Sequence, residues 1–236
     1  MIVLVTTSRR EGGPAPPAPR LRPQRGQYYV IEPFVRMIRE AGGTPLLLPA
    51  GEPDLESLLR RVDAVVITGG AFDIHPRHYG QLVRAKLDPI DEERAMSELA
   101  MARLCIERDV PILGVCGGMQ TLAVATGGTL IQDIATECPE AMEHQQPTDP
   151  VEGWHQVLLE PSILRQIFGR APVVNSTHHQ AVADPGTFRV AGYAPYGLIE
   201  AIELPNHCFC AGVQWHPELM GVQPFRALVE AARARG

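Results

Sequence analysis

The sequence predicts an α/β fold in which a mostly parallel central sheet is covered by helices on both faces and extended by antiparallel strands. Two observations support this prediction. In the first half of the 236-residue chain, short apolar runs alternate with longer stretches of helical periodicity, as in repeated strand–helix–strand units. In the second half, short strand-like segments follow one another with turns between them. No linker is long enough to separate two domains, so we expect a single domain over residues 1–236.

The first elements alternate as this fold class requires. Residues 1–7 are an apolar run typical of a buried strand. A Pro-, Gly- and Arg-rich stretch over residues 8–26 lacks periodicity, which predicts a mobile loop. Residues 28–43 have apolar side chains at helical spacing and end in two glycines, as a helix stop does. Pro33 falls early in that helix, where its missing N–H does little harm.

The alternation continues up to a glycine-rich segment in the middle of the chain. The longest helix is expected over residues 91–109, since acidic side chains in its first turn favour the positive end of the helix dipole. The remaining expected elements of this half are strands at 44–49, 63–70 and 110–115, and helices at 54–62 and 117–128.

The second half predicts an antiparallel or mixed extension of the same sheet. Cys208 and Cys210 would share one face of its last strand as small buried side chains. The expected elements are strands at 155–160, 172–177, 188–195, 198–205 and 208–215, and a final helix at 224–236.

The composition is that of an ordinary globular protein and narrows the functional classes. A formal net charge of −6 gives no support to a nucleic-acid or anionic-membrane partner. No apolar stretch approaches the length of a membrane span, and the N-terminal run is too short for a secretory leader, so we expect a cytoplasmic protein. Five cysteines without a CxxC pair argue against a disulfide framework and a cysteine-rich zinc site.

Cys116 lies between the expected strand at 110–115 and the helix that follows. Gly114, Cys116 and Gly118 have the spacing of a nucleophile elbow with sulfur in place of oxygen. The start of a helix favours thiolate over thiol, and the Gly117 amide would point towards an oxyanion. The alternative is a small buried core residue, and the elbow alone leaves both readings open. A phosphate loop is disfavoured because no Lys-Ser/Thr follows.

A candidate base is found among the eight histidines. His216 ends an apolar strand directly before Pro217, and Glu218 is close enough in sequence to orient its imidazole ring. None of the histidines shows the HExxH or paired-ligand spacing of a metal site, so no metal is expected. The adjacent His178 and His179 are, from the residues alone, most simply a satisfied pair in a turn.

The segments "PILGVCGGMQTLAVATGGTLIQDI" and "GVQWHPE" together resemble the class I glutamine amidotransferase-like superfamily. With "GGAFDIHPRHYG" and "VNSTHHQAV", the chain is more closely similar to the γ-glutamyl-γ-aminobutyrate hydrolase family, also called peptidase C26. The resemblance covers about residues 29–225 and implies a flavodoxin-like fold.

The resemblance also implies roles for individual residues. Cys116 would be the nucleophile, His216 the general acid/base and Glu218 the residue that orients it. Gly70 and Gly117 would form the oxyanion hole. The residues that would bind the substrate are Gln120, His178, His179 and Gln180.

One position departs from the family pattern. Gly117 stands where the family commonly has arginine, so a positive charge beside the thiolate is missing. A backbone amide donates whatever its side chain, and the oxyanion hole should therefore survive. The change weakens the expectation that γ-glutamyl-γ-aminobutyrate itself is the substrate.

The sequence therefore predicts a cysteine-dependent hydrolase that cleaves a small γ-glutamyl amide through a γ-glutamyl thioester, with no cofactor. Two alternatives remain: a glutaminase subunit that delivers ammonia to a separate synthetase, and a non-catalytic homologue that kept the fold. A small γ-glutamyl compound is the expected partner, and a homodimer is the default expectation for the oligomeric state.

Overall fold

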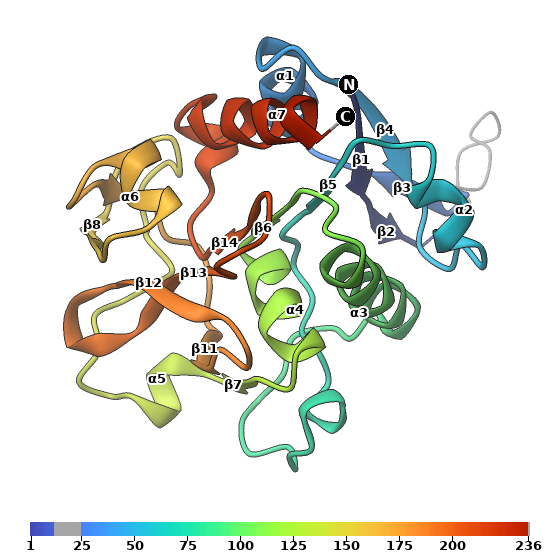
Figure 1. Ribbon diagram of the computed structural model, residues 1–236. Helices are drawn as coiled ribbons and strands as arrows, with labels where there is room; N and C mark the ends of the chain where they lie inside the picture. Colours follow the sequence, from blue (N-terminus) through green and yellow to red (C-terminus); the bar gives the residue numbers. More distant parts are fainter. Residues whose placement is uncertain (12–24, 236) are drawn as a thin grey trace, which may run out of the picture.

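The computed structural model describes residues 1–11 and 25–235, which form a central ten-stranded sheet with helices packed on both faces (Figure 1). The main path of the sheet has the order β4-β1-β5-β6-β14-β13-β11-β7, and β12 and β9 continue it from β13. This is the predicted α/β class with an antiparallel extension.

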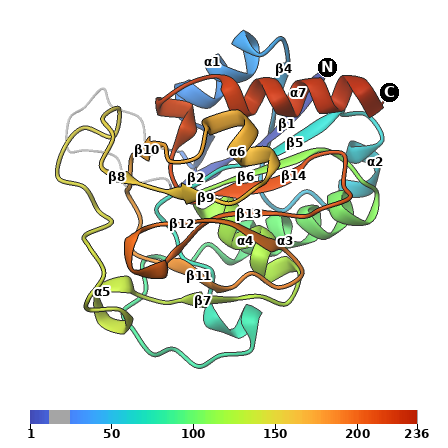
Figure 2. The ribbon, with the colours of Figure 1, turned by 60° about the vertical axis from the view of Figure 1, so that its left-hand side comes forward.

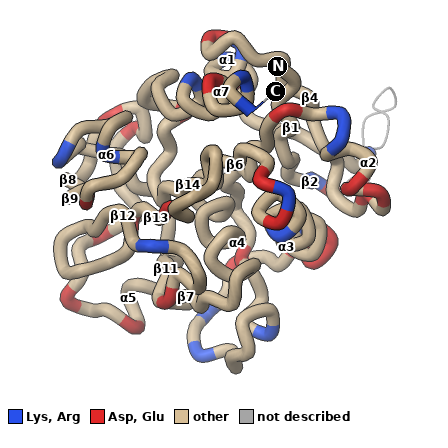
Figure 3. The backbone as a smooth tube through the Cα atoms, in the orientation of Figure 1, with Lys and Arg blue, Asp and Glu red and all other residues tan. Residues whose placement is uncertain are grey.

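The parallel half of the sheet consists of five strands. Their apolar side chains are largely buried because helices cover both faces, as in other parallel sheets. β6 and β14 are central and carry no charged residue, whereas charged residues are found mainly on the outer segments (Figure 3). The five strands are β4 (Thr44–Leu48), β1 (Ile2–Thr6), β5 (Ala64–Ile67), β6 (Ile112–Val115) and β14 (Cys210–Val213).

Two hydrophobic cores hold the helices against the sheet. One core joins alternate residues of β1, β5 and β6 to α2, α3 and α4, and the other joins the intervening residues to α1 and α7. Figure 2 shows α1 and α7 on one side of the strands and α3 and α4 on the other. The helices are α1 (Glu32–Glu40), α2 (Leu55–Leu59), α3 (Glu92–Glu107), α4 (Gly117–Ala125), α5 (Ile134–Glu137), α6 (Ile163–Phe168) and α7 (Gln223–Arg235).

The antiparallel half departs in part from the sequence prediction. β14 pairs parallel to β6 and so belongs to the parallel half, and β8 and β10 form a separate two-stranded sheet. Two members of the main sheet, β7 and β11, were not predicted. The strands outside the parallel half are β7 (Thr129–Ile131), β8 (His155–Gln156), β9 (Leu158–Leu159), β10 (Val173–Val174), β11 (Ala181–Asp184), β12 (Arg189–Tyr193) and β13 (Ile199–Glu203).

The N-terminal loop prediction is wrong at its start. Its first residues form β2 (Ser8–Arg10), which pairs in a short antiparallel ribbon with β3 (Gln27–Tyr29) just after the predicted loop, while residues 12–24 lie outside the described residues. The helix predicted from residue 28 therefore begins only at Glu32, with Pro33 in its first turn as expected.

Three short 3₁₀ segments complete the described elements, at Pro76–Tyr79, Pro195–Gly197 and Pro217–Leu219. Across residues 1–11 and 25–235, no helix combines the length and the apolar character that crossing a membrane requires.

Candidate active site

Cys116 lies on a sharp turn between β6 and α4. Its backbone has φ 53° and ψ −110°, a conformation that L-residues rarely adopt and that is typical of strained functional positions. Gly118 is required at the turn because a Cβ atom there would lie 2.1 Å from the Ile67 carbonyl oxygen. The elbow predicted from the glycine spacing is therefore present, with Cys116 at its apex.

His216 lies next to Cys116 because their strands are neighbours in the sheet. β14 pairs with β6, and the Cys116 N–H donates to the Val213 carbonyl at 2.8 Å. A Cβ atom on Gly69 would lie 3.0 Å from Cys116 Cβ and 3.1 Å from His216 Cε1, so this glycine leaves room for both side chains. The fold thus brings together two residues that are 100 positions apart in the sequence.

Glu218 fixes the orientation of the imidazole ring. Its carboxylate is completely buried and accepts a hydrogen bond from His216 Nδ1 at 2.8 Å. Nδ1 therefore carries a proton, and the other ring nitrogen is left to face the thiol. Asn175 holds the His216 backbone from both sides, accepting from its N–H at 2.8 Å and donating to its carbonyl at 3.1 Å.

The electrostatics of the pair favour a thiolate and an imidazolium. Burial raises the pKa of the Cys116 thiol, but the charge and hydrogen bond of His216 outweigh burial and hold that pKa below its ordinary value. Burial lowers the pKa of His216, yet the Cys116 thiolate and the Glu218 carboxylate raise it well above the ordinary value. A thiolate is the form in which a cysteine attacks a carbonyl.

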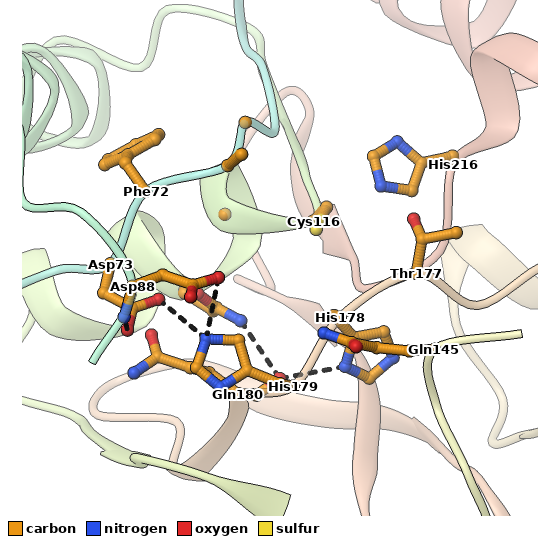
Figure 4. A pocket seen from close by; sticks show the side chains of 14 residues that line it. Phe72, Asp73, Asp88, Cys116, Gln145, Thr177, His178, His179, Gln180 and His216 are labelled. Atoms are coloured by element: carbon orange, nitrogen blue, oxygen red, sulfur yellow. Dashed lines mark hydrogen bonds and ion pairs between the residues drawn. The ribbon is translucent and has the colours of Figure 1, made fainter. Parts of the chain in front are cut away.

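A pocket of about 340 Å³ opens over the sulfur atom (Figure 4). It collects every predicted site residue except Glu218, which is buried behind His216. Gly117 donates its backbone N–H towards the sulfur, on the side where an oxyanion would form. The lining residues are Gly70, Ala71, Phe72, Asp73, Asp88, Cys116, Gly117, Gln120, Gln145, Thr177, His178, His179, Gln180 and His216.

Glutamine side chains form a hydrogen-bonded layer beside the thiol. Gln120 Nε2 donates to the Gln180 carbonyl and to Gln214 Oε1, both at 3.2 Å, and Gln214 Nε2 lies 3.6 Å from Cys116 Sγ. Gln214 was not predicted. Its position two residues before His216, at the end of the strand predicted over 208–215, is the signal that could have indicated it.

His179 is surrounded by carboxylates. Its Nε2 lies 3.0 Å from Asp73 and 3.6 Å from Asp88, and its Nδ1 lies 3.4 Å from Asp133. The hydrogen bond to Asp73 is the main cause that raises the pKa of His179 to about 9, against a smaller effect of burial. His179 is thus no simple turn residue, and Asp73 and Asp88 are pocket residues that sequence reasoning missed.

Arg94, buried on α3, holds the loop that carries Gly70. Its guanidinium donates to the carbonyls of Thr68 at 2.8 Å and Gly69 at 3.0 Å, and its Nε donates to Glu98 at 2.8 Å. Arg94 lies within a long helix that carries several charged side chains, so no local pattern indicates that it faces the site. Its contacts fix the backbone from which a Gly70 amide would act.

The prediction that Cys208 is a buried strand residue is wrong. Cys208 is exposed, because β14 begins only at Cys210, so the two do not share one buried strand face.

Comparisons with known proteins agree with the sequence motifs. The family model described as peptidase C26 matches residues 19–218. A γ-glutamyl-γ-aminobutyrate hydrolase of Escherichia coli O157:H7 is 37% identical over 79% of this chain and 77% of that protein. A glutamine amidotransferase-like protein of Rickettsia prowazekii is 34% identical over 87% of this chain and 90% of that protein.

Solved structures share the architecture at low sequence identity. One, described as a GMP synthase component from Thermoplasma acidophilum, has a TM-score of 0.61 and 19% identity, and the match covers 99% of this chain and 93% of that chain. This likeness shows a common class I glutamine amidotransferase fold.

Proposed function

The chain belongs to the peptidase C26 family, and from that premise we propose that it hydrolyses the amide bond of a small γ-glutamyl compound through a covalent thioester on Cys116. Relatives named γ-glutamyl-γ-aminobutyrate hydrolase, at 36–37% identity, support the γ-glutamyl part of this proposal.

One observation carries the mechanism. Cys116 lies at the apex of the strained elbow, His216 is beside it, and Glu218 holds the ring of His216 at 2.8 Å. A nucleophile, a base and a residue that orients the base are the three parts that thiol-based acyl transfer needs.

In the first half-reaction, the Cys116 thiolate attacks the γ-carbonyl carbon of the substrate. The developing oxyanion is stabilised by the backbone N–H groups of Gly117 and Gly70. His216 donates its proton to the departing nitrogen, the C–N bond breaks and the amine leaves. Cys116 then carries the γ-glutamyl group as a thioester.

In the second half-reaction, neutral His216 removes a proton from a water molecule, and the resulting hydroxide attacks the thioester. The C–S bond breaks, glutamate is released, and the thiolate–imidazolium pair is restored. His216 thus donates one proton in the first half-reaction and takes one proton in the second, and nothing is oxidised or reduced.

The pocket offers polar groups for the glutamyl end of the substrate. Asp73 and Asp88 provide carboxylates that suit an α-ammonium group, and Gln180 has a buried Oε1 atom with no hydrogen-bond partner among the described residues. With Gln120 and His178, these groups make a recognition surface for an amino acid rather than for a plain amide.

The leaving amine has room in a neighbouring pocket of about 440 Å³, which shares Ala71 and Phe72 with the first. This second pocket is lined by charged side chains of both signs, such as Arg9 and Glu92, and by Tyr29. Because these side chains carry both signs of charge and position 117 lacks an arginine, the pocket shows no preference for a leaving amine that bears an acidic group.

The proposal is tested with a panel of γ-glutamyl amides that bear acidic, cationic and aromatic amines, with free glutamine included. We expect turnover of at least one γ-glutamyl amide above glutamine, and none with the Cys116→Ala variant. Acid quenching during turnover followed by intact-mass analysis should reveal protein that is heavier by one γ-glutamyl group.

Glu218→Gln tests the orienting role of the carboxylate. We expect kcat to fall about 10²- to 10⁴-fold, because the imidazole loses the partner that fixes its tautomer. Glu203→Gln is the matched control: Glu203 is also buried but bonds Ile163 and Arg189, far from the thiol, and activity should be kept.

Two results would contradict the proposal. Equal γ-glutamyl hydrolysis by the parent and by Cys116→Ala would rule out the thiol as nucleophile. Hydrolysis of glutamine alone would favour a glutaminase that supplies ammonia to a synthetase.

A further inference from the structure

Three histidines and one glutamate form a buried cluster behind the wall of the active-site pocket. The side chains of His144, His155, His178 and Glu200 are each at most 2% exposed. They come from four separate segments: the loop after α5, β8, the turn before β11, and β13. Only His178 also lines the pocket.

The distances within this cluster are too long for hydrogen bonds of normal strength. Glu200 Oε1 lies 3.4 Å from His178 Nε2, 3.5 Å from His144 Nδ1 and 3.9 Å from His155 Nε2. The catalytic His216–Glu218 pair closes to 2.8 Å in the same structure. A carboxylate that only accepted hydrogen bonds from these imidazoles would draw them equally close.

Three of the four side chains also lie close enough together to surround one metal ion. A tetrahedral zinc ion binds nitrogen and oxygen ligands at about 2.0–2.1 Å, which sets neighbouring ligand atoms about 3.4 Å apart. One atom from each of His144, His155 and Glu200 falls in a group in which all separations are within 4.8 Å.

Hydrogen bonds outside the cluster fix the tautomers of the three histidines. Ser176 Oγ donates to the His144 carbonyl at 2.9 Å and accepts from the Nδ1–H of His144 at 3.0 Å, which leaves Nε2 as the free nitrogen of His144. The Nδ1–H of His178 donates to the Gln180 carbonyl at 2.9 Å, and that of His155 donates to the Gln156 carbonyl at 3.3 Å. A carbonyl only accepts, so both Nε2 atoms are left free and face Glu200. This is the arrangement that metal-binding histidines adopt in proteins.

The cluster has more hydrogen-bond acceptors than hydrogen-bond donors. Among the described residues, Nε2 of all three histidines and both carboxylate oxygens of Glu200 have no hydrogen-bond partner. One extra proton on His178 would pair with Glu200 but would leave the Nε2 atoms of His144 and His155 without a partner. A buried carboxylate and unpaired ring nitrogens are costly unless a cation binds them.

We propose that His144, His155 and Glu200 bind a divalent transition-metal ion, best matched by zinc, beside His178. Two imidazole nitrogens with one carboxylate oxygen are a donor set that zinc takes readily. This inference is independent of the proposed reaction and departs from the sequence-based expectation of no metal.

The ion would tie the pocket wall to the sheet. The His144 carbonyl accepts from the His178 N–H at 3.0 Å, His178 is followed directly by His179 and Gln180, which line the pocket, and Glu200 lies on β13. Metal at this place would fix the wall without touching the sulfur atom.

The test is the metal content of the full-length protein, purified from cells grown with added zinc. We expect one equivalent of zinc per chain in the parent, and its loss in His155→Ala and in Glu200→Gln. Asp88→Asn is the matched control: it alters the other group of potential ligands, Asp73, Asp88 and His179, and should keep the zinc. Circular dichroism checks that each variant is folded.

A second measurement does not depend on the fold of the variants. Protein prepared with Co²⁺ in place of zinc should show the intense visible absorption of a tetrahedral ion, and removal of the metal by a denaturing chelator step should lower the Tm after refolding. Metal-free parent protein would overturn the proposal and leave a proton-sharing network. Zinc lost only in Asp88→Asn would overturn it as well, because the ion would then lie in the pocket.

Discussion

At the scale of single residues, two features of Cys116 lower the stability of the folded protein: its strained backbone and its buried charge. Its φ of 53° with ψ −110° is a conformation that costs a residue with a Cβ atom about 1–3 kcal/mol. Because the strain comes from the Cβ atom, it should be relieved by glycine and kept by alanine.

We therefore expect Cys116→Gly to be more stable than Cys116→Ala by about 1–3 kcal/mol. The usual order is the reverse, since glycine in a helix or strand is about 0.5–1 kcal/mol less favourable than alanine. Urea unfolding of both variants measures the difference. If alanine is the more stable of the two, the turn is not strained.

The charge state of Cys116 leads to a prediction about reactivity. Burial raises the pKa of the thiol, but His216 brings it below the ordinary value of 9.0, so more of the thiol is ionised at neutral pH than in an ordinary cysteine. Cys208 is exposed, yet burial of its sulfur and its hydrogen bond with Asp109 raise its pKa to about 11.

A thiol-alkylating reagent at neutral pH should therefore label Cys116 before Cys208, despite the greater exposure of Cys208. Peptide mapping after short exposures measures both rates. In His216→Ala the preference should disappear, because the largest effect that opposes burial of the thiol is then removed. Labelling of Cys208 first in the parent would contradict the ion pair.

At the scale of the elements, the elbow depends on glycines that let β5, β6 and α4 approach closely. A Cβ atom at Gly118 would lie 2.1 Å from the Ile67 carbonyl oxygen of β5. A Cβ atom at Gly117 would meet only the Gly69 Cα atom, at 3.9 Å.

Gly118→Ala should consequently lower the free energy of unfolding by about 1–3 kcal/mol or more, whereas Gly117→Ala should change it by about 0.5 kcal/mol or less. The two variants add the same methyl group one residue apart, which makes each the control of the other. Similar losses in both would show that the contact with β5 does not decide the outcome, since alanine is the better helix former at either position.

The periodic elements were predictable because their local patterns and their burial agree. The buried runs of β1, β5 and β6 and the long helix α3 are visible in the sequence, as is the stop of α4 at Gly127, which adopts φ 91°. β2, β3, β7 and β11 were missed, since they are three or four residues long and are defined by pairing with distant partners.

The candidate site was predictable to the extent that its residues lie in short motifs. Cys116 and His216 stand at the ends of adjacent strands, which the fold class brings to one edge of the sheet. Asn175 and Arg94 act through contacts across the fold and carry no local signal.

At the scale of the whole molecule, His179 connects three segments that are far apart in the chain. Asp73 follows β5, Asp133 precedes α5, and Asp88 lies in the loop before α3; all three carboxylates face the ring from within 3.6 Å. The hydrogen bond to Asp73, opposed by partial burial, is the largest cause that raises the pKa of His179 to about 9.

The sign of the pH dependence follows from that shift. The folded protein binds the proton of His179 more tightly than the unfolded chain, whose histidine has an ordinary pKa of 6.5. The contribution to stability is complete below pH 6.5 and is lost as the pH rises through about 9. His179→Asn keeps a polar side chain without this titration, so its unfolding free energy should fall less over the same interval.

Urea unfolding of the parent and of His179→Asn, at pH values on both sides of this interval, isolates the effect, because all other groups titrate in both proteins. Asp73→Asn removes the largest cause and should give an intermediate slope. If the parent and His179→Asn lose stability equally with rising pH, the carboxylates do not hold the proton on this ring, and the three segments are joined by packing alone.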